Sequence, residues 1–464
     1  MDIRSLLLFL TVLPVLALST ALPYVGVLSW GWISFLNPHR EVWGIGYNLQ
    51  WNLLIAVITM GSWLVSNEPK RLRLSTPLVI LAMLTIWLSL STYFSPGQAS
   101  SMETLTSFIK VLALVLMVNF LLYKKSRLIA FIGIIVLSIG YWGIKGGLTL
   151  IGGGGVFTGP EKSMIGDRNH LALAVALSIP LMNFFRIHLA NRWLSLGFAG
   201  AMLLSAMSVV ASQSRGGFVA LLVAAVGLWF VSQKKARGLI AGVLAFGLIF
   251  AFASDKWWDR IETIQSAEQD SSFQGRLDAW KIAINIANDR VFGLGLRNIQ
   301  NRVLAAPYVP PDSKGARAAH SIYFEVLSDA GWVALFLFLA FYLSAVWEGE
   351  RAKRIARNYV EMAWIYNLTC MIQISLLVYA VGGAALSMAY WGIPLILAIS
   401  LAILRRMAVA ARREIEAPRP APAVAGEGAE AKPAARPAKG VSGTGADTKP
   451  TPPRRPGRFR PEPA

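Results

Sequence analysis

The chain has 464 residues, of which 55% are hydrophobic and only 15% are charged. This composition is too apolar for a soluble protein of that length and indicates a protein of the lipid bilayer. The formal net charge of +19 does not indicate a nucleic-acid partner, because the lysines and arginines are spread over short loops and the C-terminal tail. The single cysteine, Cys370, lies in an apolar stretch, which excludes a disulfide framework and a cysteine metal site.

Apolar stretches of about 20 residues, the length that crosses a bilayer, recur from Leu6 to Leu404. We therefore expect an all-α polytopic membrane protein with about 12 transmembrane helices, in which residues 1–405 form the membrane domain. Residues 406–464 are basic and rich in proline and alanine. They are expected to be a disordered tail on the cytoplasmic side, because such a segment cannot bury a core.

The first apolar stretch, residues 6–36, is interrupted by Pro14, Pro23 and Gly26. We interpret it as retained rather than as a cleaved signal peptide, because no convincing small-residue cleavage site follows it. Its length suits either one long broken span or two short ones. We prefer a single net crossing, which would leave Arg4 on the cytoplasmic side as the positive-inside rule favours.

Positive charges cluster in alternate loops between the apolar stretches, and the positive-inside rule predicts that these loops are cytoplasmic. The clusters lie at residues 70–73, 124–127, 186–192, 234–237, 351–357 and 405–406. The intervening segments are then external, and they comprise residues 37–49, 96–101, 149–169, 212–216, 254–320 and 382–390.

The segment 254–320 is the longest of the external segments, and long loops on a rigid scaffold commonly carry function. Within it, residues 274–288 have the pattern of a weakly amphipathic helix, with Leu277, Trp280 and Ile284 on one strip. A helix of this kind can lie on the membrane surface.

Arg276 and Trp280 are four residues apart in this predicted helix, so they share a face. In that position the indole can pack against a sugar or against the guanidinium group. The alternative is that Trp280 only anchors the helix at the membrane interface, where tryptophan is common.

Two arginines stand at the start of apolar stretches on the expected external side, against the charge rule. Arg215 lies in Ser-Gln-Ser-Arg-Gly-Gly, and Arg168 lies in Gly-Asp-Arg-Asn-His. A charge at membrane depth costs free energy, so each arginine needs a partner or a function. Guanidinium groups bind phosphate oxygens bidentately, and Gly216 and Gly217 would let a phosphate approach a helix N-terminus. We therefore predict anion binding, and the alternative is that these side chains snorkel to lipid headgroups.

Of the four histidines, His188 lies in an expected cytoplasmic loop and His39 lies near a helix end, whereas His170 and His320 are external and beside the membrane. An imidazole, with an unperturbed pKa of about 6.5, can accept a proton from a hydroxyl or form a hydrogen bond to a phosphate. His320 stands where the long external segment enters the next helix, and the arginines of the external segments favour a catalytic role for it. The alternative is an interfacial histidine without a role.

The sequence lacks two kinds of phosphate site. The glycine run Gly152 to Gly155 does not lead directly into Lys162 and Ser163, so it lacks the spacing of a phosphate-binding loop. The external segments contain no Asp-x-Asp pair and no His-x-x-x-His spacing, so we expect neither a metal site nor a cofactor. Arginines would then neutralise a diphosphate leaving group.

Several short motifs follow one another around the long external segment. They are Ser214-Arg215-Gly216, Gly275-Arg276-x-x-x-Trp280, Gly293-Leu294-Gly295, His320-Ser321-x-Tyr323 and Gly331. With these motifs in this order, residues 1–405 resemble the O-antigen ligase and polymerase superfamily of bacterial envelope proteins. Within it, the chain looks most like the O-glycosylation ligases associated with exosortase systems. Such proteins typically have an asparagine after the histidine, where this chain has Ser321.

The resemblance implies a metal-independent glycosyltransferase of the bacterial inner membrane whose active face is periplasmic. It would transfer a preassembled glycan from undecaprenyl pyrophosphate to an acceptor hydroxyl on a protein, a lipid or another glycan. Its catalytic residues would be His320, as general base or orienting group, and Arg215 and Arg276 at the diphosphate. The further substrate-binding residues would be Arg168, His170, Arg297, Trp280 and Tyr323.

Three other functions stay open on the sequence. A glycan repeat-unit polymerase would use the same donor with a sugar hydroxyl as the acceptor. A transporter or flippase would bind its cargo near the bilayer midplane, commonly between internal repeats. The halves of this chain show no convincing repeat, and apart from Lys110 and Lys145 midspan charges are scarce. A non-catalytic scaffold would tolerate substitutions on the external rim.

Overall fold

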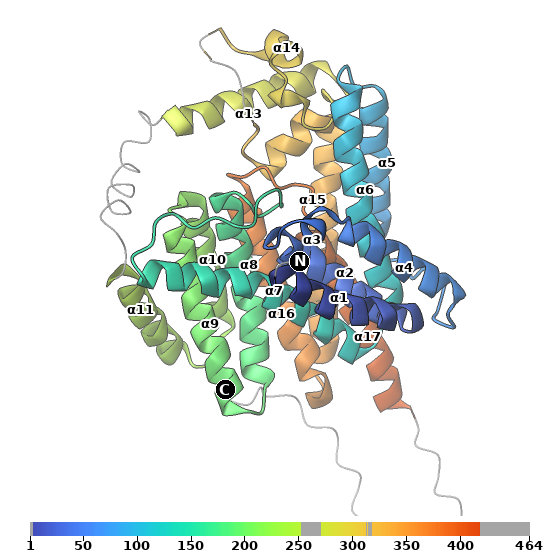
Figure 1. Cartoon of the computed structure of the whole chain (residues 1–464), viewed down its shortest axis with the longest axis vertical. Helices are drawn as coiled ribbons and strands as arrows, with labels where there is room; N and C mark the ends of the chain where they lie inside the picture. The colour runs from blue at the N-terminus through green and yellow to red at the C-terminus, as the bar shows by residue number, and fades with distance from the viewer. Residues whose placement is uncertain (1–2, 252–270, 312, 314–317, 418–464) are drawn as a thin grey trace, which may run out of the picture.

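The computed structural model describes residues 3–251, 271–311, 313 and 318–417. The long helices are α1 (Ile3–Ala21), α2 (Pro23–Leu36), α4 (Trp51–Val65), α5 (Thr76–Tyr93), α6 (Gln98–Leu121), α7 (Lys125–Ile151), α8 (Arg168–His188), α9 (Arg192–Ala211), α10 (Arg215–Val231), α11 (Lys235–Ala251), α13 (Ser271–Asp289), α15 (Ile322–Ala356), α16 (Ala363–Gly383) and α17 (Gly392–Glu416) (Figure 1). The short ones are α3 (Ile45–Asn48), α14 (Arg302–Ala305), and the 3-10 turns η1 (Pro38–Arg40), η3 (Asn298–Gln300), η4 (Ala306–Tyr308) and η5 (Val360–Met362).

The protein is an all-α polytopic membrane protein, as the composition predicts. Within the described ranges, nine helices are long and apolar enough to cross a bilayer, and strands are absent. Shorter apolar helices, among them α4 and α10, lie in the same bundle. The number of twelve crossings stays a prediction.

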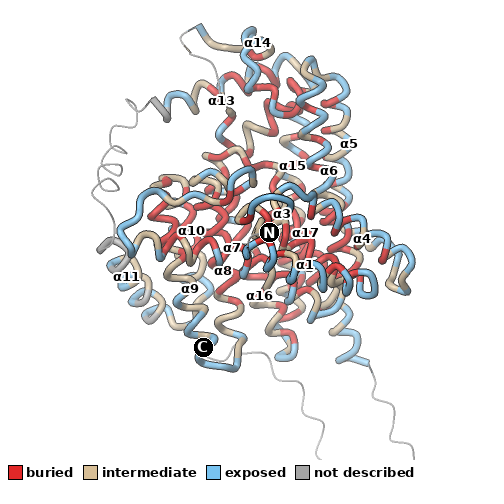
Figure 2. The backbone as a smooth tube through the Cα atoms, viewed as in Figure 1, coloured by how far each residue is buried: buried red, intermediate tan, exposed pale blue. Residues whose placement is uncertain are grey.

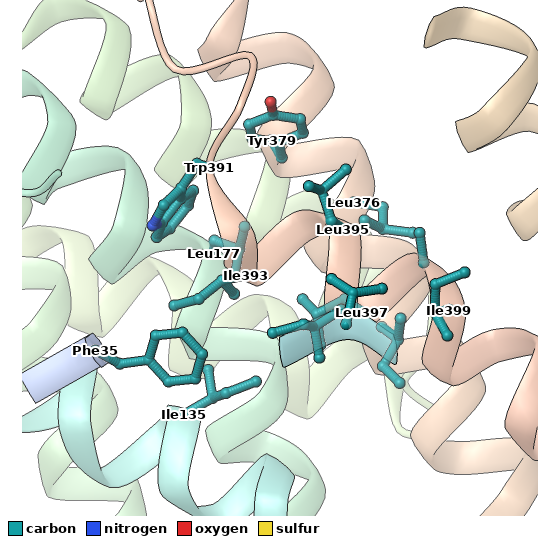
Figure 3. Packing of buried hydrophobic residues seen from close by; sticks show 14 of the residues in the cluster. Phe35, Ile135, Leu177, Leu376, Tyr379, Trp391, Ile393, Leu395, Leu397 and Ile399 are labelled. Atoms are coloured by element: carbon teal, nitrogen blue, oxygen red, sulfur yellow. The ribbon is translucent and has the colours of Figure 1, made fainter. Parts of the chain in front are cut away.

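The core of the bundle lies among α8, α16 and α17. In α8 and α17 the apolar stretch is 72% buried, against 28% in α1, so α1 lies at the periphery. Figure 2 shows the same gradient, with buried backbone in the middle of the bundle and exposed backbone around it. Side chains of α2, α7, α8 and α16 gather around the first turns of α17, among them Phe35, Ile135, Leu177 and Leu376 (Figure 3).

The loops that carry basic clusters meet at one end of the bundle, which we call the basic end. Arg127 of α7 forms an ion pair with Glu68 in the loop before α5 (2.6 Å). Arg406 of α17 donates to the carbonyl oxygen of Arg73 (3.2 Å) and to Asn119 Oδ1 (2.7 Å). The loop before α5 and the end of α6 therefore lie beside the last part of α17.

The segments expected to be external meet at the opposite end, which we call the site end. Asn298 Nδ2 donates to the carbonyl oxygen of Gly97 (3.1 Å). Lys145, which lies within an apolar stretch of the sequence, forms an ion pair with Glu41 there (2.7 Å). The charge pattern thus sorts these loops into the groups that the structure brings together, and which end faces the periplasm stays a prediction.

The N-terminal stretch forms two helices that run in opposite directions, because α2 begins at Pro23, whose missing N–H ends α1. Arg4 lies 5.1 Å from the centre of the Trp43 ring, so α1 begins at the site end. Its last turn reaches the basic end, where Ser62 Oγ donates to the carbonyl oxygen of Thr20 (2.9 Å). The expectation of one net crossing with Arg4 beside the basic clusters is therefore wrong.

Helix α13 confirms the helix predicted for residues 274–288 but buries a different face. Ala279, Ile282 and Ile286 are fully buried. They belong to one apolar cluster with Leu294, Ile299, Ala305 and Ala319. The predicted strip is only half-buried, and it comprises Leu277, Trp280 and Ile284. Protein therefore covers the most apolar face of α13, because the small alanines allow close packing.

Helix α17 continues to Glu416, beyond the expected end of the membrane domain at residue 405. The first residues of the expected tail, 406–416, are therefore helical. The remainder of that tail, 418–464, lies outside the described residues, as do residues 254–270 of the expected external loop.

Candidate active site

His320 stands at the entrance to α15 at the site end. Its backbone has a φ of 49°, which residues other than glycine rarely adopt, and its N–H donates to Ser387 Oγ (2.9 Å). Ser321 then caps α15 by accepting from the Tyr323 N–H (3.3 Å). His320 is exposed, so the structure holds its backbone and leaves the imidazole accessible.

The turn at residues 384–391, between α16 and α17, is held by two carboxylates of α15. Glu325 Oε2 accepts from a backbone N–H of this turn (2.9 Å), and Asp329 Oδ2 accepts from the Tyr390 hydroxyl (2.9 Å). Asp329 is fully buried, and a buried carboxylate needs such partners because its desolvation is costly. The 384–391 turn is thus fixed to α15, and through Ser387 it holds the histidine.

Helix α13 holds the chain on the other side of His320. Trp280 Nε1 donates to the carbonyl oxygen of Ala319 (3.1 Å), and its ring stacks on Phe324 (4.9 Å between centres, 11° between planes). The tryptophan therefore positions the residue directly before His320. Contact between Trp280 and a sugar stays a prediction.

Charged groups of α8 and α13 act on the His320 imidazole. Loss of hydration beside the protein, and then the positive charge of Arg276, lower the pKa of His320 below its ordinary value of 6.5. His170 lowers this pKa further, whereas Asp167 raises it. These groups therefore share one electrostatic environment, in which His320 is neutral at pH 7.

Arg168 and Arg215 are each the first residue of a long helix, α8 and α10. The preceding side chains cap the two helices, Asp167 by accepting from a backbone N–H at 2.8 Å and Ser214 at 3.0 Å. Both arginines are half-buried. Each helix thus presents a guanidinium group and an N-terminal dipole at the same end of the bundle.

The first turn of α10 packs between α8 and the 384–391 turn. A Cβ atom added to Gly217 would lie 2.5 Å from the Cβ of Ala172 on α8, and one added to Gly216 would lie 3.7 Å from the Cβ of Ala385. Glycine at 217 is therefore needed for this close approach. The backbone beside Arg215 borders the turn that holds His320, so the site includes the starts of α8, α10 and α15.

Tyr323 and Arg297 lie differently from the other predicted site residues. The Tyr323 hydroxyl donates to the carbonyl oxygen of Ala380 on α16 (2.8 Å), so it joins two helices. Arg297 is exposed, and its N–H donates to Asp329 Oδ1 (2.9 Å). Arg297 therefore lies by the carboxylates that hold the 384–391 turn, and its contact with a substrate stays a prediction.

Three glycines with positive φ lock α15 against the preceding segment: Gly293 (64°), Gly295 (90°) and Gly331 (74°). Helix α15 is broken at Ala330 and Gly331, where two carbonyl groups lose their partners within the helix. The N–H groups of residues 294 and 295 bind these carbonyl oxygens, on Ser328 and Asp329, at 2.9 Å each. The Gly293-Leu294-Gly295 motif and Gly331 thus act together. They fix the first part of α15, between His320 and the break at Ala330 and Gly331.

Sequence reasoning missed four residues that position the site, namely Glu325, Asp329, Ser387 and Tyr390. The two acids carried a signal, because they stand four residues apart in an apolar helix, where an acidic group needs a partner. Ser387 and Tyr390 carried none. In the part of the chain that the structure describes, no group of three or more histidine, cysteine or acidic residues is placed to hold a metal ion.

The fold and this site together define a polytopic membrane protein with arginines and a histidine gathered at one end of a helical bundle. Residues 200–339 match the family described as O-antigen ligase, and residues 3–190 match a family of unknown function. A search of curated proteins found no match. The match over residues 200–339 supports an assignment to the O-antigen ligase superfamily and, in general terms, a glycan ligase or polymerase-type activity.

The two matched regions divide the site between them. The O-antigen ligase region contains Arg215, Arg276 and His320, whereas Arg168 and His170 lie in the other region. The 384–391 turn lies beyond both. The site is therefore assembled from three parts of the chain.

Proposed function

We propose that this protein is a glycan ligase of the bacterial inner membrane, which transfers a preassembled glycan from undecaprenyl pyrophosphate to an acceptor hydroxyl at the periplasmic face. The observation that carries the proposal is the convergence at the site end. A neutral His320 lies within reach of the charge of Arg276, and the 384–391 turn that holds it also borders the first turn of α10, which begins with Arg215.

In the proposed step the acceptor oxygen attacks the first sugar of the glycan at its anomeric carbon. The bond from this carbon to the diphosphate oxygen breaks, and undecaprenyl diphosphate leaves with the electron pair. The acceptor proton passes to His320, whose lowered pKa keeps it available as a base at neutral pH. Arg215 and Arg276 stabilise the negative charge that develops on the leaving diphosphate.

The surface of α10 supports a lipid-linked donor. Val219, Leu222 and Val226 are 46%, 38% and 51% exposed, and their spacing from Arg215 places all four residues on one face of the helix. This apolar strip runs from the arginine into the expected membrane region. A polyprenyl chain lying along it would bring its diphosphate to Arg215.

The purified full chain in phospholipid vesicles, supplied with an undecaprenyl-diphosphate-linked glycan and an acceptor, tests the proposal. We expect His320→Ala to slow transfer by roughly 100-fold or more, the contribution typical of general-base catalysis. Arg215→Gln is expected to weaken transfer and donor binding together, because both states carry the diphosphate. His188→Ala is the matched control, since His188 bonds the carbonyl oxygen of Phe184 at the far end of α8.

Near-normal transfer by a folded His320→Ala variant would overturn the proposed mechanism. The identity of the acceptor that receives the glycan distinguishes a ligase from a polymerase. Transfer to a protein or lipid hydroxyl supports the ligase, whereas elongation only of a second lipid-linked glycan would identify a repeat-unit polymerase.

A further inference from the structure

A second site candidate lies at the basic end, opposite His320. A cavity of about 460 Å³ opens between α5, α15 and α17. Its polar lining comprises Ser75, Thr76, Glu348, Arg351, Arg405 and Arg406, and apolar residues of α5, of α17 and of the loop before α5 complete it. The descriptions of the two matched families do not mention such a cavity. The proposed transfer reaction does not use it either.

The cavity lining is strongly cationic. Glu348 accepts from Arg405 (2.8 Å), and Arg351 approaches the same carboxylate at 3.9 Å. Arg406 makes its bonds to groups outside the lining, Arg73 and Asn119. The lining thus contains three arginines and a single carboxylate, so it favours an anion.

Two hydrogen-bond donors in the lining have no partner among the described residues. Arg406 Nε and Ser75 Oγ are both buried, and leaving such donors unpaired costs free energy. Ser75 also precedes the first turn of α5 without capping it through its side chain. An anion with several oxygen atoms would satisfy these donors and the positive end of the α5 dipole.

Exposed apolar strips lead from the cavity along both neighbouring helices. On α5, Val79, Met83 and Ile86 are 43%, 50% and 62% exposed. On α15, Leu343 and Trp347 are 70% and 55% exposed, and they precede Arg351 at four-residue intervals. Two hydrocarbon chains can therefore follow these strips while an anionic group occupies the cavity.

We propose that this cavity binds the headgroup phosphate of an acidic phospholipid, with the acyl chains along α5 and α15. Arg351 and Arg406 hold the phosphate oxygens, and Ser75 donates from the start of α5. The charge of the lining selects an anionic headgroup over a zwitterionic one, as basic pockets between membrane helices do. The site stabilises the packing of α5 against α17 at this end.

The test uses the full chain in nanodiscs of phosphatidylcholine with increasing fractions of phosphatidylglycerol. The lipid is expected to raise the midpoint of thermal unfolding in a saturable way. Arg351→Gln and Arg406→Gln are expected to raise the phosphatidylglycerol fraction needed for half of this shift by roughly tenfold. Arg357→Gln is the matched control: it removes the same charge from the same helix end, but Arg357 is exposed and does not line the cavity.

Three outcomes would overturn the proposal. The first is an equal shift in the wild type and all three variants, which would reflect surface charge alone. The second is a shift of the same size from inorganic phosphate in pure phosphatidylcholine, which would identify a soluble anion. The third is an unchanged response of Arg351→Gln, a variant expected to fold because the Arg351 side chain is 47% exposed.

Discussion

At the scale of single residues, the site depends on His320, whose backbone is fixed by hydrogen bonding and whose imidazole ring is accessible. The N–H of His320 binds Ser387, and the chain before it is held by Trp280. The pKa of the imidazole lies below its ordinary value because hydration is reduced and Arg276 is near. A base of this kind is lost when the pH falls through its pKa, so the acid limb of transfer is expected below pH 6.5.

The dependence of kcat/KM on pH tests the contribution of Arg276. Arg276→Gln removes a positive charge and is expected to raise the pKa of His320, so the acid limb moves to higher pH. Arg276→Lys keeps the charge and is expected to keep the limb near its wild-type position. If the acid limb of the Arg276→Gln variant lies at the same pH as in the wild type, the limb does not arise from the titration of His320.

The sequence predicted some of these residues for a physical reason. Arg215, Arg168 and His320 stand out because polar groups next to apolar stretches need an explanation. Ser387 does not stand out, because it lies 67 residues from His320 and only the packing of α16 and α17 against α15 brings the two together. Positioning residues of this kind need tertiary structure.

At the scale of elements, the break in α15 sets the direction of the helix that follows His320. The segment around Gly293 supplies two N–H groups to the carbonyl groups freed at the break, and Trp87 Nε1 donates to the carbonyl oxygen of Ala330 (2.8 Å). The apolar pattern predicted a helix here but could not locate the break. Likewise, the pattern predicted α13 but did not indicate which face packs against protein, because alanines carry little weight in a periodicity argument and pack tightly in the structure.

Gly331→Ala tests the break. The φ at this position is +74°, and a Cβ atom would lie 2.3 Å from the carbonyl oxygen of Val291, so we expect a loss of stability of about 1 to 3 kcal/mol. Thermal unfolding in detergent should show a lower midpoint together with reduced transfer. Gly155→Ala is the control, because nothing lies within 4 Å of its added Cβ. Equal midpoints for the two variants would contradict a structural role for the break.

At the scale of the whole molecule, the helices separate two sets of loops. One set carries the basic clusters and the proposed lipid site, and the other carries His320 and the arginines of α8, α10 and α13. The distribution of lysines and arginines predicted this division, because each loop between two apolar stretches either contains a basic cluster or lacks one. It failed at the N-terminus, where the single charge of Arg4 was too weak to outweigh the turn at Pro23 and the contact with Trp43.

The proposed function depends most on the orientation of the helical bundle in the membrane, which cysteine labelling measures. In a chain lacking its own cysteine through Cys370→Ala, Val303→Cys would mark the site end, since Val303 is 80% exposed, and Asn358→Cys would mark the basic end. A membrane-impermeant maleimide added to intact spheroplasts is expected to label Val303→Cys at once and Asn358→Cys only after permeabilisation. The reverse pattern would place His320 in the cytosol, away from the proposed periplasmic donor, and would contradict the account.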